Sequence, residues 1–215
     1  IIQNTIHPLD DIAARNFDNI EETWFYTVFL QAVVRFLLEK EQGDTLDASY
    51  QYAKDALLHY ARWMVANERP YLQQAEKLEF PNTTWAAQDI RKGYILIAAA
   101  YFSPEQANAF RTSADVYYRY VGETLSACEH SDSTRILAIL MQNTGAKQFF
   151  ANKTPAKHSS LAKYQQRTHK NKTMAIAGLL LKQLTRLSVR NELKWLSFRS
   201  NKVAKLLGNS THETN

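Results

Sequence analysis

Apolar side chains recur every three or four positions through most of the first 150 residues, which is the spacing of an amphipathic helix. The pattern predicts five helices, at about 20–41, 46–67, 83–102, 104–127 and 133–143. Before the fourth helix, Ser103, Pro104 and Gln106 form a start signal, because serine caps helix N-termini and proline is tolerated in the first turn. The first part of the chain is therefore expected to be a series of helices.

The predicted helices differ in how their polar side chains are distributed. The first, third and fifth have almost no polar face, whereas the second and fourth carry charged residues around an apolar stripe. A helix that is apolar on every side must be enclosed by other structure. The alternation predicts an all-α fold of antiparallel helical hairpins in two layers, with inner helices enclosed by amphipathic outer ones.

One segment gives this architecture a family resemblance. The residues LEFPNTTWAAQD, from Leu78 to Asp89, enter the third helix through Trp85. With the alternation and a hairpin period of about 50–60 residues, the segment resembles the six-hairpin (α/α)6 toroid. That fold is shared by glycoside hydrolases, polysaccharide lyases and N-acylglucosamine epimerases. The resemblance covers roughly residues 20–150, about two and a half hairpins of a toroid-like domain.

The resemblance implies a substrate cleft at the N-terminal ends of the inner helices. Tryptophan rings stack on the apolar faces of sugars, so Trp85 and Trp24, with Gln88, are the candidate substrate-binding residues. Glycoside hydrolysis requires a pair of carboxyl groups. Asp89 would supply one of them, and the candidates for the other are Glu22, Glu79 and Asp132, with Glu21 also at the cleft mouth.

Each candidate also has a purely structural interpretation. Asp89 lies three residues before Lys92 and could form a surface ion pair with it. Glu22 lies in a first helical turn, where the helix dipole favours acids, and Asp132 is placed to cap a helix. The two tryptophans could be core anchors. The sequence leaves these interpretations open, and it also leaves open whether the chemistry is that of a hydrolase, a lyase or an epimerase.

Cofactor and metal motifs are missing from the sequence. It contains no glycine-rich nucleotide loop and no GxSxG, and its six histidines form neither HExxH nor His-x3-His. We therefore predict no cofactor and no metal site. The single cysteine, Cys128, excludes an internal disulfide framework and slightly favours a reducing compartment such as the cytoplasm.

Charge divides the chain into two regions. Residues 1–146 carry 12 basic and 19 acidic side chains, whereas residues 147–215 carry 14 basic and 2 acidic ones. We predict a helical-hairpin domain at 1–150 and a basic helical region at 151–215, packed on the first. The predicted basic helix Lys172–Leu207 could dock as an outer helix, bind an anionic membrane surface or enter the groove of a partner protein. Nucleic-acid binding is disfavoured, because no recognition motif is present.

The functional prediction follows from the resemblance and the candidate residues. We expect a carbohydrate-active domain that binds or hydrolyses a poly- or oligosaccharide at the N-terminal ends of the inner helices. The alternative is a non-catalytic helical scaffold that binds a protein partner or an anionic membrane surface. An exposed Trp85 beside two carboxylates would favour the enzyme.

Overall fold

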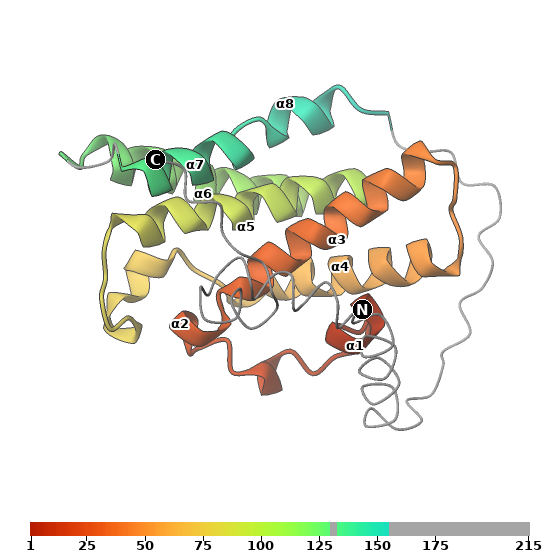
Figure 1. The fold of residues 1–215 in the computed structure, drawn as a ribbon, viewed down its shortest axis with the longest axis horizontal. Helices are drawn as coiled ribbons and strands as arrows, with labels where there is room; N and C mark the ends of the chain where they lie inside the picture. Colours follow the sequence, from red (N-terminus) through yellow and green to blue (C-terminus); the bar gives the residue numbers. More distant parts are fainter. Residues whose placement is uncertain (130–132, 155–215) are drawn as a thin grey trace, which may run out of the picture. The chain divides into compact units, whose positions relative to one another are not determined.

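The computed structural model describes residues 1–129 and 133–154, so Asp132 and the predicted basic helix Lys172–Leu207 lie outside the described residues. Every element within the described ranges is an α-helix or a 3-10 helix, which confirms the all-α prediction (Figure 1). In chain order the elements are α1 (Ile2–Thr5), η1 (Ala13–Arg15), α2 (Ile20–Thr23), α3 (Phe25–Gln42), α4 (Ala48–Asn67), η2 (Tyr71–Lys77), α5 (Thr83–Phe102), η3 (Pro104–Gln106), α6 (Ala107–Ser126), α7 (Thr134–Asn143) and α8 (Ala146–Ala151). Among these helices, none has the length and apolar character needed to cross a bilayer.

Three long helices begin at residues whose side chains cap the backbone. The carboxylate of Asp47 accepts two hydrogen bonds from N–H groups in the first turn of α4, at 3.1 and 3.0 Å. The side-chain oxygen of Asn82 accepts one from Thr84 at the start of α5, at 3.0 Å, and Ser133 caps α7. These caps satisfy N–H groups that have no partner inside the helix, and they place α5 and α7 close to their predicted starts.

Two other predicted helices begin where expected but differ in detail. The predicted helix 20–41 is divided at Trp24 into α2 and α3, because the Trp24 carbonyl accepts both the N–H and the hydroxyl of Thr27, at 3.1 and 2.8 Å. Ser103 does not cap a helix. Its hydroxyl donates to the carboxylate of Glu105, and the residues that follow form the short helix η3 before α6.

The helices α3, α5 and α7 run in one direction, and α4 and α6 run in the opposite direction (Figure 1). In the described part of the chain, α5 contacts α3, α4, α6, α7 and α8, and its most extensive contact is with α6. The N-terminal ends of α3, α5 and α7 consequently point to the same side of the domain.

The enclosure predicted for the inner helices holds for α5 but not for α3 and α7. Helix α5 buries fifteen of its twenty residues, whereas α3 buries five of eighteen. Helices α3 and α7 both pack on α5, and each keeps apolar side chains exposed to solvent. Phe25 is 61% exposed at the start of α3, and Met141 is 83% exposed on α7.

Candidate functional site

A pocket lies where the N-terminal ends of α3, α5 and α7 meet. Its volume is about 290 Å³. We call it the indole pocket, after the two tryptophans in its wall. Its lining comes from α2, from the connection that enters α5, and from the first turns of α5 and α7, and consists of Glu21, Trp24, Phe80, Asn82, Thr84, Trp85, Gln88 and Arg135.

Aromatic rings form much of the wall of the indole pocket. Trp24 and Trp85 stand nearly perpendicular, at 87° with 6.2 Å between ring centroids. Phe25 stacks on Trp24 at 3.9 Å, and Tyr71 lies behind Trp85 at 5.5 Å. Phe80, in the connection before α5, is 70% exposed. The indole N–H of Trp85 donates to the Phe80 carbonyl at 3.3 Å, which holds the ring in place. Large aromatic faces are therefore presented to solvent in a fixed arrangement.

Polar groups complete the pocket. A Glu21 oxygen accepts the backbone N–H of Glu79 at 2.8 Å and so fastens the connection that enters α5. The side-chain oxygen of Gln88 accepts a hydrogen bond from Arg91 at 2.8 Å, which orients the amide and leaves its nitrogen as the donor. Arg135 is exposed and has no ion pair with any described residue. The pocket thus offers hydrogen-bond donors beside apolar rings.

Asp89 belongs to a different structure, a buried cluster around Lys92. Neither side chain has any exposed surface, and the Lys92 ammonium lies 3.0 Å from an Asp89 oxygen and 2.7 Å from a Glu68 oxygen. The other Asp89 oxygen accepts the backbone N–H of Tyr71 at 2.8 Å, and the ammonium lies 3.4 Å from the centroid of the Tyr71 ring. Tyr26 donates its hydroxyl hydrogen to Glu68. We call this the Lys92 cluster.

The electrostatics of the Lys92 cluster are those of two carboxylates that share one cation. Burial raises the pKa of Asp89 to about 6, although the charge of Lys92 opposes that shift. Burial alone would lower the pKa of Lys92, but the negative charges of Asp89 and Glu68 raise it above its usual value. The lysine is therefore a permanently charged ammonium whose contacts are all internal, which is a structural role.

The predicted substrate-binding residues Trp24, Trp85 and Gln88 line one pocket, whereas the predicted catalytic residues do not. Asp89 is enclosed with Lys92, so the pair proposed for the surface is instead fully buried. Glu22 is exposed on α2, and Glu79 is exposed before α5. Neither of these two acids lines the indole pocket.

The carboxylate that does line the pocket is Glu21, and one of its oxygens already holds the connection before α5. Asp132 lies outside the described residues. The described residues therefore bring together the groups needed for binding but not the carboxylate pair needed for hydrolysis.

Sequence reasoning did not identify Phe80, Asn82, Thr84 or Arg135 as part of the site. Arg135 is the second residue of α7, and its place in the first turn of a predicted inner helix was the available signal. No group of histidine, cysteine, aspartate or glutamate side chains in the described residues could hold a metal ion. Searches of protein-family models, curated proteins and solved structures give no match to this chain.

Proposed function

We propose that this domain binds a saccharide in the indole pocket. The observation that carries the proposal is the meeting in one open pocket of two indole rings, an oriented amide and the Arg135 guanidinium, which forms no ion pair with a described residue. Its volume of about 290 Å³ is just below the roughly 300–1,000 Å³ range of ligand pockets. This size suits one sugar ring, with any further rings extending over the exposed face of Phe80.

The chemistry of a sugar matches each part of the wall. A pyranose has an apolar C–H face that can stack on Trp24 or Trp85, and its hydroxyl groups can accept from Gln88 and Arg135. The N-terminal ends of α5 and α7 carry partial positive charge, which favours acceptor oxygens and carboxylates on the ligand. A sugar with a carboxylate therefore belongs in the test panel beside neutral ones.

Tryptophan fluorescence tests the proposal directly. Replacing Trp63 and Trp195 by phenylalanine leaves Trp24 and Trp85 as the emitting residues, both in the pocket wall. Titration of this protein with neutral and uronic-acid oligosaccharides should give a saturable change in emission with at least one of them. The absence of a saturable change with every member of a broad glycan panel would overturn the proposal.

Two exposed positions supply variants that keep the fold. Phe80→Ala and Arg135→Ala each remove a lining group without opening the core, and each should weaken saccharide binding by about tenfold. Phe149→Ala is the matched control, because Phe149 is 52% exposed on α8 and lies outside the pocket. Equal affinities for the three variants would contradict a saccharide site at this place.

The exposed aromatic side chains favour a second candidate, a non-catalytic surface for a protein partner. Phe25 and Phe80 are both largely exposed beside the indole pocket, and aromatic residues and arginine dominate the centres of protein interfaces. A photo-crosslinking residue at position 25 would join the partner covalently. If a saccharide fills the pocket and the crosslink yield does not change, the saccharide site and the protein-binding surface are distinct.

We also propose that these helical hairpins are arranged as part of an (α/α) toroid. It is supported by the parallel directions of α3, α5 and α7 and by the position of α5 between the other two. The apolar faces that α3 and α7 keep toward solvent are where further hairpins of such a ring would pack. An experimental structure in which neighbouring hairpins cover Phe25 and Met141 would support it, and solvent at both faces would contradict it.

A further inference from the structure

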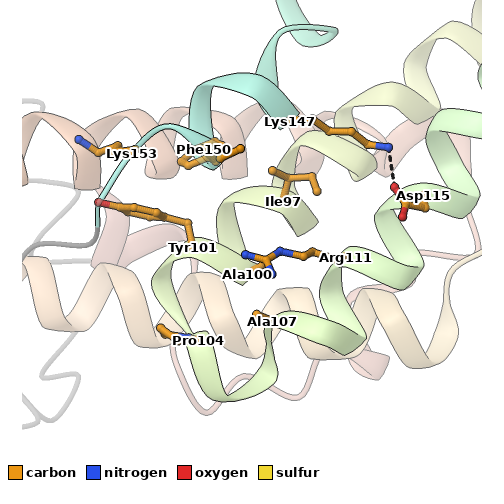
Figure 2. Close-up of a pocket in the computed structure, with 11 residues that line it drawn as sticks. Ile97, Ala100, Tyr101, Pro104, Ala107, Arg111, Asp115, Lys147, Phe150 and Lys153 are labelled. Carbon is orange, nitrogen blue, oxygen red and sulfur yellow. Dashed lines mark hydrogen bonds and ion pairs between the residues drawn. The ribbon is translucent and has the colours of Figure 1, made fainter.

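A second pocket lies at the opposite end of α5, between α5, α6 and α8 (Figure 2). Its volume is about 470 Å³. Tyr101 at this end and Gln88 in the indole pocket are thirteen residues apart on one helix, about 20 Å at a rise of 1.5 Å per residue. The two pockets share no lining residue. This second pocket, which we call the arginine pocket, can therefore bind a ligand independently.

The floor of the arginine pocket is apolar. Tyr101 and Phe150 are 6% and 7% exposed, and their rings contact at 5.4 Å between centroids. The Tyr101 hydroxyl donates to a Glu41 oxygen at 2.7 Å, so the polar end of this side chain is bound to the protein and its ring faces the pocket. Ala100 and Ala107 line the floor with methyl groups, which leave room for a flat ligand.

The rim of the arginine pocket carries an excess of positive charge. Arg111 reaches from α6 into the middle of the pocket (Figure 2), and no described residue forms an ion pair with it. Lys147 pairs with Asp115 at one end. Lys153 lies at the other end, 3.9 Å from a Glu41 oxygen and 5.9 Å from the centroid of the Tyr101 ring. Three cations and the two carboxylates of Asp115 and Glu41 thus surround the pocket, and Arg111 is the cation that no described carboxylate pairs.

We propose that the arginine pocket binds an amphipathic organic anion. The apolar body of the ligand lies on Tyr101 and Phe150, and its carboxylate, sulfonate or phosphate group is bound by the Arg111 guanidinium. Neither half suffices alone, because the exposed Arg111 guanidinium is hydrated in the absence of a ligand and the floor carries no charge. The ligand class is therefore an aromatic or short aliphatic acid rather than a free inorganic anion or a neutral hydrophobe.

Calorimetric titration with matched probes tests both halves of this proposal. 2-Naphthoate carries the aromatic body and the charge, 2-naphthamide carries the same body without the charge, and inorganic phosphate carries charge alone. We expect saturable binding of 2-naphthoate, at least about tenfold weaker binding of 2-naphthamide, and no measurable binding of phosphate. Equal binding of the two naphthalene probes, or no binding of 2-naphthoate, overturns the proposal.

Three variants on α6 test whether 2-naphthoate binds in the arginine pocket. Arg111→Ala should weaken 2-naphthoate binding by about tenfold or more. Arg119→Ala, eight positions further along α6 and outside the lining, should leave it unchanged. Asp115→Asn removes the lining carboxylate and releases Lys147, so it should strengthen binding a few-fold.

Arg111→Ala is expected to weaken 2-naphthoate binding and Asp115→Asn to strengthen it, and both positions are exposed. A general loss of structure would weaken binding in both variants and so cannot produce this result. Thermal unfolding of each variant by circular dichroism serves as the check that the fold is kept. Equal affinities for Arg111→Ala and Arg119→Ala, or ligand-induced NMR shifts at the indole N–H signals instead of the Ala100 and Ala107 methyl groups, would overturn the assignment.

Discussion

At the scale of single residues, Lys92 is a charged side chain with no exposed surface, and its burial has an electrostatic cost. Transfer of an ammonium ion out of water costs several kcal/mol even after the protein relaxes. In this domain the cost is offset by carboxylates of Asp89 and Glu68, by the Arg69 carbonyl at 2.8 Å, and by the face of the Tyr71 ring. The stabilising contacts come from two segments, so the cluster joins the end of α4 to the start of α5.

Removal of Lys92 should destabilise the protein strongly. Lys92→Met keeps the length of the side chain but leaves two carboxylates without a cation, and it should lower the free energy of unfolding by about 3–5 kcal/mol. Lys77→Met is the control, because the Lys77–Asp18 pair is solvent-exposed, and its loss should cost at most about 1 kcal/mol. Urea denaturation measures both. Similar losses in the two variants would contradict the structural role of the cluster.

The raised pKa of Asp89 predicts a pH dependence of stability. Because burial raises the pKa of this carboxyl from 3.8 to about 6, the folded protein binds a proton that the unfolded chain has already released. The contribution of Asp89 to stability is therefore full at low pH and is lost as the pH rises through about 6.

Asp89→Asn removes this titration, so the variant should lose less stability than the wild type between about pH 4 and pH 7. Urea midpoints measured across that range give the comparison. A wild-type curve parallel to that of the variant would show that Asp89 titrates at its ordinary pKa.

At the scale of elements, the contact between α5 and α6 depends on the absence of a side chain at Gly93. A Cβ atom there would lie 2.9 Å from Cε2 of the Tyr118 ring. Gly122, on α6, has open space around the corresponding position. Of these two glycines, only Gly93 is required for the close packing of α5 against α6, because a side chain at Gly122 would meet no neighbour.

The two glycines should respond to alanine in opposite directions. Gly93→Ala forces the Tyr118 ring to move and should destabilise the protein by about 1–3 kcal/mol. Gly122→Ala gains helix propensity without a clash and should stabilise it by about 0.5–1 kcal/mol. Thermal and chemical unfolding of the pair measure the difference. A stabilising effect of Gly93→Ala would mean that α5 and α6 are further apart than described.

At the scale of the whole domain, a polar chain crosses the row of helices α3, α5 and α7. Arg91 on α5 donates to the side-chain oxygen of Gln31 on α3 at 2.7 Å, and the Gln31 amide nitrogen donates to Asn143 on α7. Asn143 in turn donates to the Ile139 carbonyl at 2.6 Å. One side chain, Gln31, therefore connects three helices that lie far apart in the sequence.

Gln31→Leu should loosen α7 in particular. The variant removes the donor to the side-chain oxygen of Asn143. Leaving this buried oxygen without a hydrogen bond costs about 1–3 kcal/mol. Hydrogen exchange of the α7 amides should accelerate about tenfold or more, because this short helix has few other buried contacts. Amides in the middle of α4 serve as the internal reference. Uniform acceleration in α4 and α7 would indicate global destabilisation instead.

The sequence predicted the helices well because helix periodicity and capping are local. Asn82 and Ser133 are followed by helices at their predicted places, and the three predicted substrate-binding residues meet in one pocket. Burial is not local. The enclosure of Asp89 depends on Glu68 and Tyr71, about twenty residues earlier, and the exposure of α3 and α7 depends on which helices lie beside them. The arginine pocket likewise needs Arg111 and Phe150 from separate helices.

The Lys92 cluster has a consequence for how α5 is set among its neighbours. Most of α5 is surrounded by apolar side chains, and its few polar residues, Asp89 and Lys92 among them, distinguish one rotation about its axis from another. Asp89 and Lys92 lie three residues apart on α5 and turn with it, so only one rotation of the helix brings this pair to Glu68 and to the backbone N–H of Tyr71. Any other rotation would separate this buried pair from Glu68 and from the Tyr71 N–H. The charged pair at the base of the helix thereby selects the orientation in which Trp85 and Gln88 face the indole pocket.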